Sequence, residues 1–114
     1  HVDNYYKDAS ILCLTSTFEG WPLCLTEAQA NGVIPISFNC CAGIEAILGP
    51  NKVNGILVPN GDINAFAKEL TELINNPQLM EEIRKNVLKK VLTYSPELVG
   101  KKWLNLFNNL LEVK

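Results

Sequence analysis

The chain lacks the features that mark several classes of protein. It has no excess of positive charge, because 10 lysines and arginines face 12 aspartates and glutamates, and this argues against nucleic-acid binding. It has no apolar run near the roughly 20 residues that a membrane helix needs, so we predict no transmembrane segment. It also lacks repeats and low-complexity segments, and a composition of 47% apolar and 19% charged residues is typical of a globular domain.

The cysteines show no recognisable pairing pattern. Cys13, Cys24, Cys40 and Cys41 have spacings that fit neither a zinc site nor a disulfide framework. We therefore expect free thiols and a reducing, cytoplasmic location, with peripheral contact to a membrane left open. The chain also opens on His1 without an initiating methionine, so we interpret its 114 residues as a piece of a longer protein.

Three short apolar runs predict β-strands over Ala9–Thr15, Val33–Phe38 and Ile56–Pro59. The first run is almost continuously apolar, which is typical of a strand buried on both faces in a parallel sheet. Pro35 lies inside the second run and favours an edge position or a strand end for it. Two runs separated by a helical segment in this way favour a parallel arrangement.

Helices are expected between the strands, over Pro22–Asn31 and Ile44–Leu48. Proline suits the first position of a helix, and Asn31-Gly32 is a typical helix end. The alternation of strands and helices predicts the α/β class, with a short parallel sheet flanked by helices. Three strands are few for an open sheet, so we expect further strands upstream of this chain.

Three helices are expected at the C-terminal end, because three capping residues each precede a helical apolar pattern. These caps are Asp62, Asn76 and Ser95, and proline follows the last two directly. The expected apolar stripes are Phe66, Leu70, Leu73 and Ile74; Leu79, Ile83, Val87 and Val91; and Val99, Trp103, Leu106 and Leu110. Trp103 and Phe107 are expected to pack in the core or against a missing domain, and Tyr5 and Tyr6 are interpreted as packing residues.

The loop Ser16–Trp21 is the predicted ligand side of the molecule. Ligands of open parallel sheets bind at the carboxyl ends of the strands, and this loop follows the first strand. The helix after it leaves the N–H groups of Leu23 and Cys24 without helical partners, which favours an anion such as phosphate. Gly20 lets the backbone approach a ligand closely, because it has no Cβ.

Two glutamates flank this predicted anion site. Glu27 lies four residues after Leu23, on the same helix face and one turn deeper, where a carboxylate suits two neighbouring hydroxyls such as a ribose diol. Glu19 lies before the helix, on the other side of the site. A nucleotide-sugar, with a diol, phosphates and a sugar in that order, matches the layout. Each glutamate could equally be a helix-dipole partner or a solvated residue.

The stretches STFEGWPLCLTEAQANGVIPISFNCCAGIEAI and NGILVPNGDINAFAKELTELINNP resemble the C-terminal part of the retaining GT-B glycosyltransferases often called group 1. The matching motifs are Ser16–Gly20, then Glu27-Ala28 after seven intervening residues, then the strand motif Gly32–Ile36. Gly43–Glu45 corresponds to a Gly-x-x-Glu motif of the family, here with only one residue between the glycine and the glutamate, and Asn54–Ile56 matches in register. The resemblance covers roughly Tyr5–Trp103. It implies the distal half of a Rossmann-like donor-binding domain with a helical C-terminal end, whose upstream half-domain and acceptor domain lie outside this chain.

The resemblance implies roles for individual residues. Glu19 resembles the catalytic glutamate that contacts the donor sugar near the reacting centre, and Glu27 the one that binds the ribose hydroxyls. The backbone of the loop and helix start is implied to face the sugar and the diphosphate, at positions Gly20, Trp21, Leu23 and Cys24. The family often has a glycine or a proline after the aromatic residue; here it is Pro22, which cannot donate an N–H, so the set of amide donors is one smaller. The segment NCCAG replaces the commoner acidic or glycine-rich loop.

The implied reaction moves a sugar from a nucleotide-sugar to a hydroxyl of a sugar or lipid-linked acceptor, with retention and without a metal or a further cofactor. The chain alone is then expected to be inactive and to have a tendency to form homodimers. Two alternatives stay open at this point: a nucleotide-sugar epimerase of the same fold, and a non-catalytic α/β binding module.

Overall fold

β2 (Ile34–Phe38) is the central strand of a three-stranded parallel sheet with the order β1-β2-β3. Its neighbours are β1 (Ile11–Leu14) and β3 (Ile56–Val58). Ile11 pairs with the first residue of β2, and the pairing with β3 begins two residues later. The structure, a computed structural model, describes residues 1–112. It confirms the predicted α/β class and the parallel sheet.

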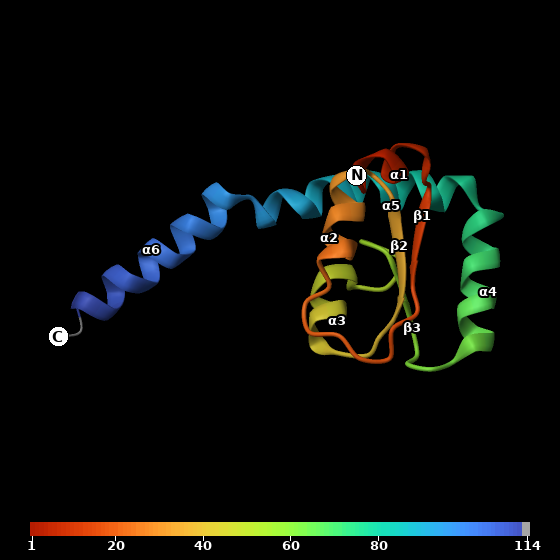
Figure 1. Cartoon of the computed structure of the whole chain (residues 1–114), viewed down its shortest axis with the longest axis horizontal. Coiled ribbons are helices and arrows are strands. Elements are labelled where there is room, and N and C mark those ends of the chain that lie inside the picture. The colour runs from red at the N-terminus through yellow and green to blue at the C-terminus, as the bar shows by residue number, and fades with distance from the viewer. Residues whose placement is uncertain (113–114) are drawn as a thin grey trace.

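Helices cover both faces of this sheet (Figure 1). α2 (Leu23–Ala30) and α3 (Ala42–Leu48) lie on one face. α4 (Ile63–Ile74) lies on the other face, and α5 (Pro77–Lys90) runs along the end of the sheet from α4 toward α2. α1 (Asp3–Asp8), where no helix was expected, packs against α2. The result is a three-layer arrangement.

Successive side chains of β2 point to opposite faces of the sheet, so the core is divided into two parts. Ile34, Ile36 and Phe38 point toward α4 and α5, where they pack against buried side chains of those helices. The opposite face has a separate core that α2 and α3 supply, made of Leu25, Ile44, Ile47 and Leu48. All five residues of β2 are buried, so this strand has no face in contact with water.

The predicted helix caps are confirmed for all three C-terminal helices. Asp62 Oδ1 accepts the backbone N–H of Ala65 at 2.9 Å, and Asn76 Oδ1 accepts that of Leu79 at 3.1 Å. Ser95 Oγ accepts the backbone N–H of Leu98 at 3.3 Å. Each cap thereby satisfies one of the donors that the first turn of a helix leaves free.

The expectation that Pro35 marks a strand edge or end is wrong, because Pro35 lies inside the central strand. Its carbonyl oxygen faces Gly55, which is one residue before the pairing of Ile36 with Ile56 begins. The missing N–H of Pro35 therefore falls beside a position where β3 has not yet started. Proline is usually excluded from central strands because it removes a hydrogen bond between strands, and no such bond is lost here.

Burial also corrects three smaller expectations. β1 was expected to be buried on both faces, but it is a half-buried edge strand with Cys13 exposed. Tyr5 is 80% exposed and packs nowhere in the core, whereas Tyr6 is buried as expected. Ile74 lies in the last turn of α4 and is exposed.

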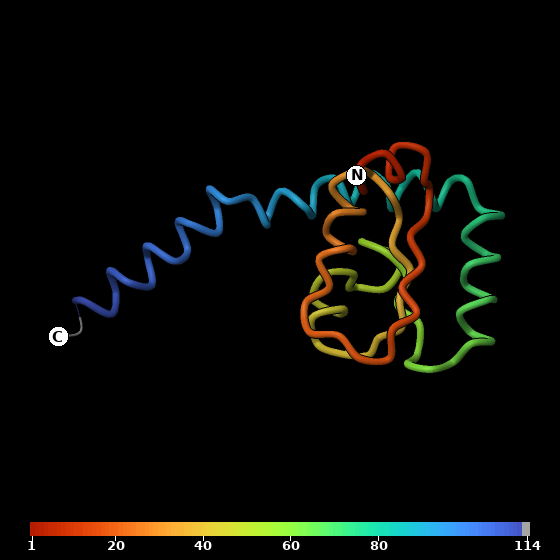
Figure 2. Tube along the Cα trace, in the orientation of Figure 1, coloured from red at the N-terminus to blue at the C-terminus, as the bar shows by residue number. Residues whose placement is uncertain are grey.

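The C-terminal helix departs from the rest of the molecule (Figure 2). A short 3₁₀ turn, η1 (Val91–Tyr94), leads from α5 into α6 (Pro96–Glu112), which projects away from the sheet and extends the molecule to 56 Å. No residue of α6 is buried. Trp103 and Phe107 lie on it with their ring centroids 5.7 Å apart and both more than half exposed. Of the two expected kinds of packing for this pair, the one in the core is therefore wrong, and the one against a further domain stays a prediction.

Candidate functional site

The parallel strands place their three carboxyl-terminal loops at one edge of the sheet, the lower edge in Figure 1. These loops are residues 15–22 after β1, residues 39–41 after β2 and residues 59–62 after β3. The first turns of α2, α3 and α4 follow them directly. Helix N-termini carry partial positive charge and free N–H groups, so this edge is the chemically suited side for an anionic ligand.

Loop 15–22 is fixed by the start of α3. The thiol of Cys41 donates a hydrogen bond to the carbonyl oxygen of Gly20, with an S···O distance of 3.3 Å. Gly43, in the first turn of α3, approaches the same oxygen so closely that a Cβ at Gly43 would collide with it. A glycine at position 43 therefore permits the contact between the two loops. A Cβ at Gly20 itself would meet nothing within 4 Å, so that face of the loop is open.

The first turn of α2 presents its backbone to this open side. Pro22 is the N-cap of the helix, with ψ at 105°, rather than its first residue as expected. Its carbonyl oxygen accepts the N–H of Leu25 at 3.1 Å. The N–H groups before Leu25 belong to Leu23 and Cys24, and the first amides of a helix have no partner within it. The predicted pair of amide donors therefore lies at the expected place.

Both glutamates act on one thiol at this helix start. Burial raises the pKa of the Cys24 thiol, the carboxylate of Glu19 raises it further, and Glu27 adds a smaller effect of the same sign. The backbone N–H of Leu25 acts in the opposite direction by favouring the thiolate. The negative charge of both carboxylates therefore reaches the first turn of α2, where it disfavours a thiolate at Cys24.

Tyr6 is a site residue that the sequence did not reveal, because it was interpreted as a packing residue only. Its hydroxyl lies between two acceptors of α2, at 3.3 Å from the carbonyl oxygen of Cys24 and 3.5 Å from Oε2 of Glu27. Burial raises the pKa of Tyr6, and the carboxylate of Glu27 raises it further. The neutral hydroxyl therefore remains a donor, and it orients the otherwise exposed carboxylate.

Gln29 is a second residue that sequence reasoning missed. It is fully buried, and its Nε2 donates to the carbonyl oxygens of Ile47 at 3.1 Å and Asn54 at 3.0 Å. These bonds tie α2 to the end of α3 and to the turn before β3. Polar groups inside a core need such partners, and here they fix the helix that carries Glu27.

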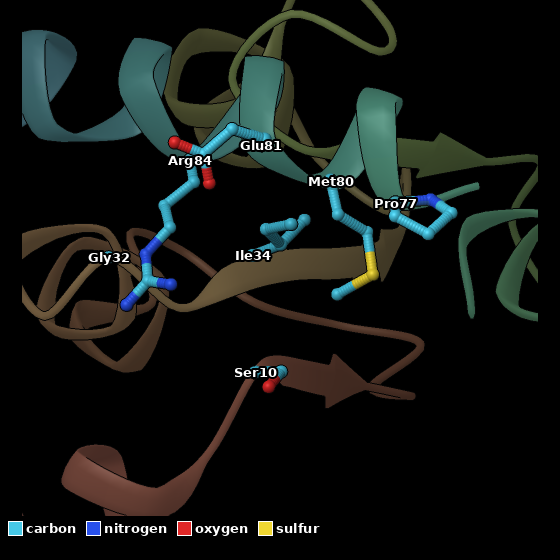
Figure 3. A pocket seen from close by; sticks show the side chains of 7 residues that line it. All are labelled: Ser10, Gly32, Ile34, Pro77, Met80, Glu81 and Arg84. Atoms are coloured by element: carbon cyan, nitrogen blue, oxygen red, sulfur yellow. The ribbon is translucent and has the colours of Figure 1, made fainter. Parts of the chain in front are cut away.

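Two of the cavities in the described part of the chain lie near the ends of the strands. The larger, of about 560 Å³, opens on the α4 side of the same edge, and apolar side chains with Thr15 and Thr17 form most of its wall. A smaller one of about 150 Å³ lies at the opposite end of the strands (Figure 3), where Ser10 faces Arg84 and Met80 of α5. Neither lining includes Glu19 or Glu27, although Thr15 and Thr17 of loop 15–22 line the larger cavity.

The cysteines near the site are free thiols, as expected. Burial raises the pKa of Cys40, and the neighbouring thiol of Cys41 raises it further. Within residues 1–112 no three side chains of histidine, cysteine, aspartate or glutamate are grouped so as to hold a metal ion. The helices in that part of the chain are all too short or too polar to span a membrane.

The sequence and fold match known proteins. The model of the family "Glycosyl transferases group 1" matches residues 1–90. An uncharacterized glycosyltransferase of Haemophilus influenzae is 35% identical, over 90% of this chain and 29% of its own length. The poly(ribitol-phosphate) alpha-N-acetylglucosaminyltransferase of Staphylococcus aureus is also 35% identical, over 90% of this chain and 21% of its own. This chain therefore spans less than a third of these relatives.

A solved structure agrees with the sequence relatives. A mutant of S. aureus TarM, in complex with fondaparinux, alpha-GlcNAc-glycerol and UDP, superimposes with a TM-score of 0.81. It is 32% identical and covers 92% of this chain and 21% of its own. The chain belongs to the group 1 glycosyltransferase family, and the resemblance of its motifs to that family is confirmed.

The contact between the loops can be tested with two glycines that both lie in helices. Gly43→Ala should lower the free energy of unfolding by about 1–3 kcal/mol, since the new methyl group collides with the backbone at Gly20. Gly100→Ala, in α6 with nothing within 4 Å of a Cβ, should raise helix stability by up to about 1 kcal/mol instead. Urea denaturation measures the first effect and circular dichroism the second. Equal and stabilising effects of both substitutions would contradict the collision.

Proposed function

We propose that this chain is the distal half of the donor-binding domain of a retaining GT-B glycosyltransferase. The longer enzyme transfers a sugar from a nucleotide-sugar to a hydroxyl of a sugar or lipid-linked acceptor in the cytoplasm. The observation that supports the proposal is the helix start of α2, with Glu27 inside the helix and Glu19 in the loop before it, in a chain that belongs to this family.

Each part of the site suits one part of the donor. The amides of Leu23 and Cys24 and the dipole of α2 suit the diphosphate, and they stabilise it as a leaving group without a metal ion. Glu27 lies about 6 Å deeper along the axis, as four residues at 1.5 Å each predict, and it suits the ribose diol. The carboxylate accepts hydrogen bonds from two neighbouring hydroxyls, and Tyr6 holds it in place. UDP is the first nucleotide to test, because TarM binds it.

Glu19 is proposed to act at the sugar. It lies in the open loop before α2, next to Gly20, whose missing Cβ leaves space for a ligand. A carboxylate near the anomeric carbon stabilises the positive charge that develops there in the transition state. Glycosyltransferase names among the relatives favour this reaction over epimerisation and over a purely binding module.

The first prediction concerns Glu27. In the full-length transferase, Glu27→Gln should weaken use of the nucleotide-sugar by about 1.5–3 kcal/mol, the scale of a hydrogen bond to a charged group. Donor kcat/KM measures the loss. Glu82→Gln is the matched control, because Glu82 is exposed on α5 and away from the site. Unchanged donor kinetics in Glu27→Gln would rule out the ribose contact.

A second prediction concerns Glu19. If Glu19 stabilises charge at the reacting carbon, Glu19→Ala should lower kcat by about a hundredfold while the Kd of the sugar-free nucleoside diphosphate changes far less. Steady-state kinetics and calorimetric titration with UDP give the two numbers. Equal losses in both would mean that Glu19 serves binding or folding alone.

A third prediction concerns the 114-residue chain by itself. It should show no transferase activity and bind nucleotide-sugars no more tightly than roughly millimolar, because it supplies one wall of a two-domain cleft. It should also self-associate, since β1 has a free edge and α6 exposes its apolar stripe. Calorimetry and light scattering measure the two properties.

A matched pair on α6 locates this self-association. Trp103→Lys should shift the chain toward monomer, whereas Asn105→Lys, also on the surface of α6, should not. Micromolar donor binding by this chain would show that the site is self-contained and contradict the third prediction. A chain that stays monomeric at high concentration would contradict the predicted self-association.

A further inference from the structure

Tyr94 contacts two segments that lie far from it in the sequence, loop 15–22 and α3. It is the last residue of η1, the turn between α5 and the projecting helix α6. Its ring meets the ring of Trp21 edge-on, with centroids 5.6 Å apart and planes at 84°. Its hydroxyl donates to the carbonyl oxygen of Ala46 in α3 at 3.5 Å, and Lys90 Nζ lies 5.8 Å from its ring centroid. Edge-on contact and a cation over the face are both favourable for an aromatic ring.

Trp21 is the residue through which this contact reaches the site. It is the last loop residue before the N-cap Pro22, so its backbone leads directly into the free amides of α2. Its side chain is 46% exposed, and the half that is covered includes the contact with Tyr94. On the other side of the loop, Gly20 is held by Cys41. The end of loop 15–22 is thus fastened at two points, to α3 by its backbone and to η1 by its side chain.

We propose that Tyr94 is a positioning residue for the donor site, which it acts on through Trp21. By holding the Trp21 ring it sets the orientation of the loop end, and with it the direction of the amides of Leu23 and Cys24. The same residue lies two positions before the first residue of α6. Donor affinity therefore depends on the conformation of the junction from which α6 leaves the body. This inference rests on the proposed function of the α2 site.

The size of the effect follows from the type of contact. An edge-to-face aromatic pair contributes about 0.5–1.5 kcal/mol beyond its buried area, which corresponds to roughly a two- to tenfold change in an equilibrium constant. Coupling between two sites is reciprocal. A donor that orders loop 15–22 must therefore also order η1 and the start of α6, and by the same factor.

The spectroscopic test uses the full-length transferase labelled with 5-fluorotryptophan. The resonance of Trp21 is the one that disappears in Trp21→Phe. Tyr94→Leu should shift this resonance, because the ring of Tyr94 no longer lies beside the indole. Tyr94→Phe should leave it close to its original position, because the ring contact remains and only the hydroxyl is lost. Tyr5→Leu is the matched control, since Tyr5 is 80% exposed and in the same protein.

The functional test measures the donor KM and kcat of the same variants. Tyr94→Leu should raise the donor KM by roughly two- to tenfold with little change in kcat, and Tyr94→Phe should restore it. Trp21→Leu removes the contact from the other side, and the double variant should be no worse than either single one. A Trp21 resonance that does not move, or a donor KM that stays at its original value in Tyr94→Leu, would overturn the proposal.

Amide hydrogen exchange tests the reciprocal effect. Val99 N–H donates to the backbone of Ser95 at 3.0 Å, and Leu98 N–H donates to the side chain of Ser95. Both amides should exchange more slowly when UDP is bound, and the effect should be absent in Tyr94→Leu. The amide of Ile83, in the buried part of α5, is the internal reference. Equal protection in both proteins would mean that Tyr94 does not couple the two places.

The failure of this inference can be told apart from a failure of the proposed function. If Glu27→Gln weakens donor use while Tyr94→Leu does not, the α2 site is correct and only the positioning role is wrong. If neither variant affects the donor although the Trp21 resonance moves in Tyr94→Leu, the contact exists but the site around α2 does not bind a donor.

Discussion

Burial of β2 on both faces is the constraint on which the rest of this molecule depends. A strand with no solvated face requires helices on both sides of the sheet, and parallel neighbours require crossovers that bring those helices there. The crossovers α2 and α3 occupy one face, and α4 with α5 covers the other. All three strands consequently end at the same edge, where the first turns of α2, α3 and α4 collect. The position of the candidate site is thus a consequence of how the core is buried.

Backbone contacts, more than side chains, give this edge its shape. The carbonyl oxygen of Gly20 accepts the Cys41 thiol and lies against the backbone of Gly43, which lacks a Cβ. Other side chains supply charge, at Glu19 and Glu27, or orient those charges and the loop, at Tyr6 and Trp21. A rigid backbone frame with a few polar groups is the arrangement expected of a preorganised ligand site.

Local sequence chemistry predicted those features that depend on neighbours in the chain. The caps Asp62 and Asn76 were predictable because each bonds an amide three residues away. The expectation for Pro35 was wrong because a proline is tolerated there only if β3 begins after it, and the residues around Pro35 do not show where β3 begins. The expectation that Trp103 packs in the core was wrong because an amphipathic pattern shows that one face of a helix is apolar, but not whether this chain covers that face.

The candidate site divides in the same way. Glu19, Gly20 and Glu27 were identified because their spacing around a helix start has a direct chemical meaning. Their roles in donor binding stay predictions; the structure shows that Glu27 lies in α2 and Glu19 and Gly20 in the loop before it. Tyr6 could not be found, since its hydroxyl meets Glu27 across 21 residues of sequence. Tyr94 is separated from Trp21 by most of the chain, and nothing in either residue type indicates that they meet.

The chemistry of the α2 wall also bears on what such a unit can recognise. Free amides recognise any diphosphate, and a carboxylate beside them recognises any ribose diol; neither group distinguishes one base or one hexose from another. If the proposed function holds, these residues supply the interactions that all nucleotide-sugars share. Selectivity for a particular sugar then needs groups that contact the exocyclic positions of the hexose and the edge of the base. Those contacts require the opposite wall of the cleft, and a unit that spans less than a third of its relatives can belong to enzymes that transfer different sugars.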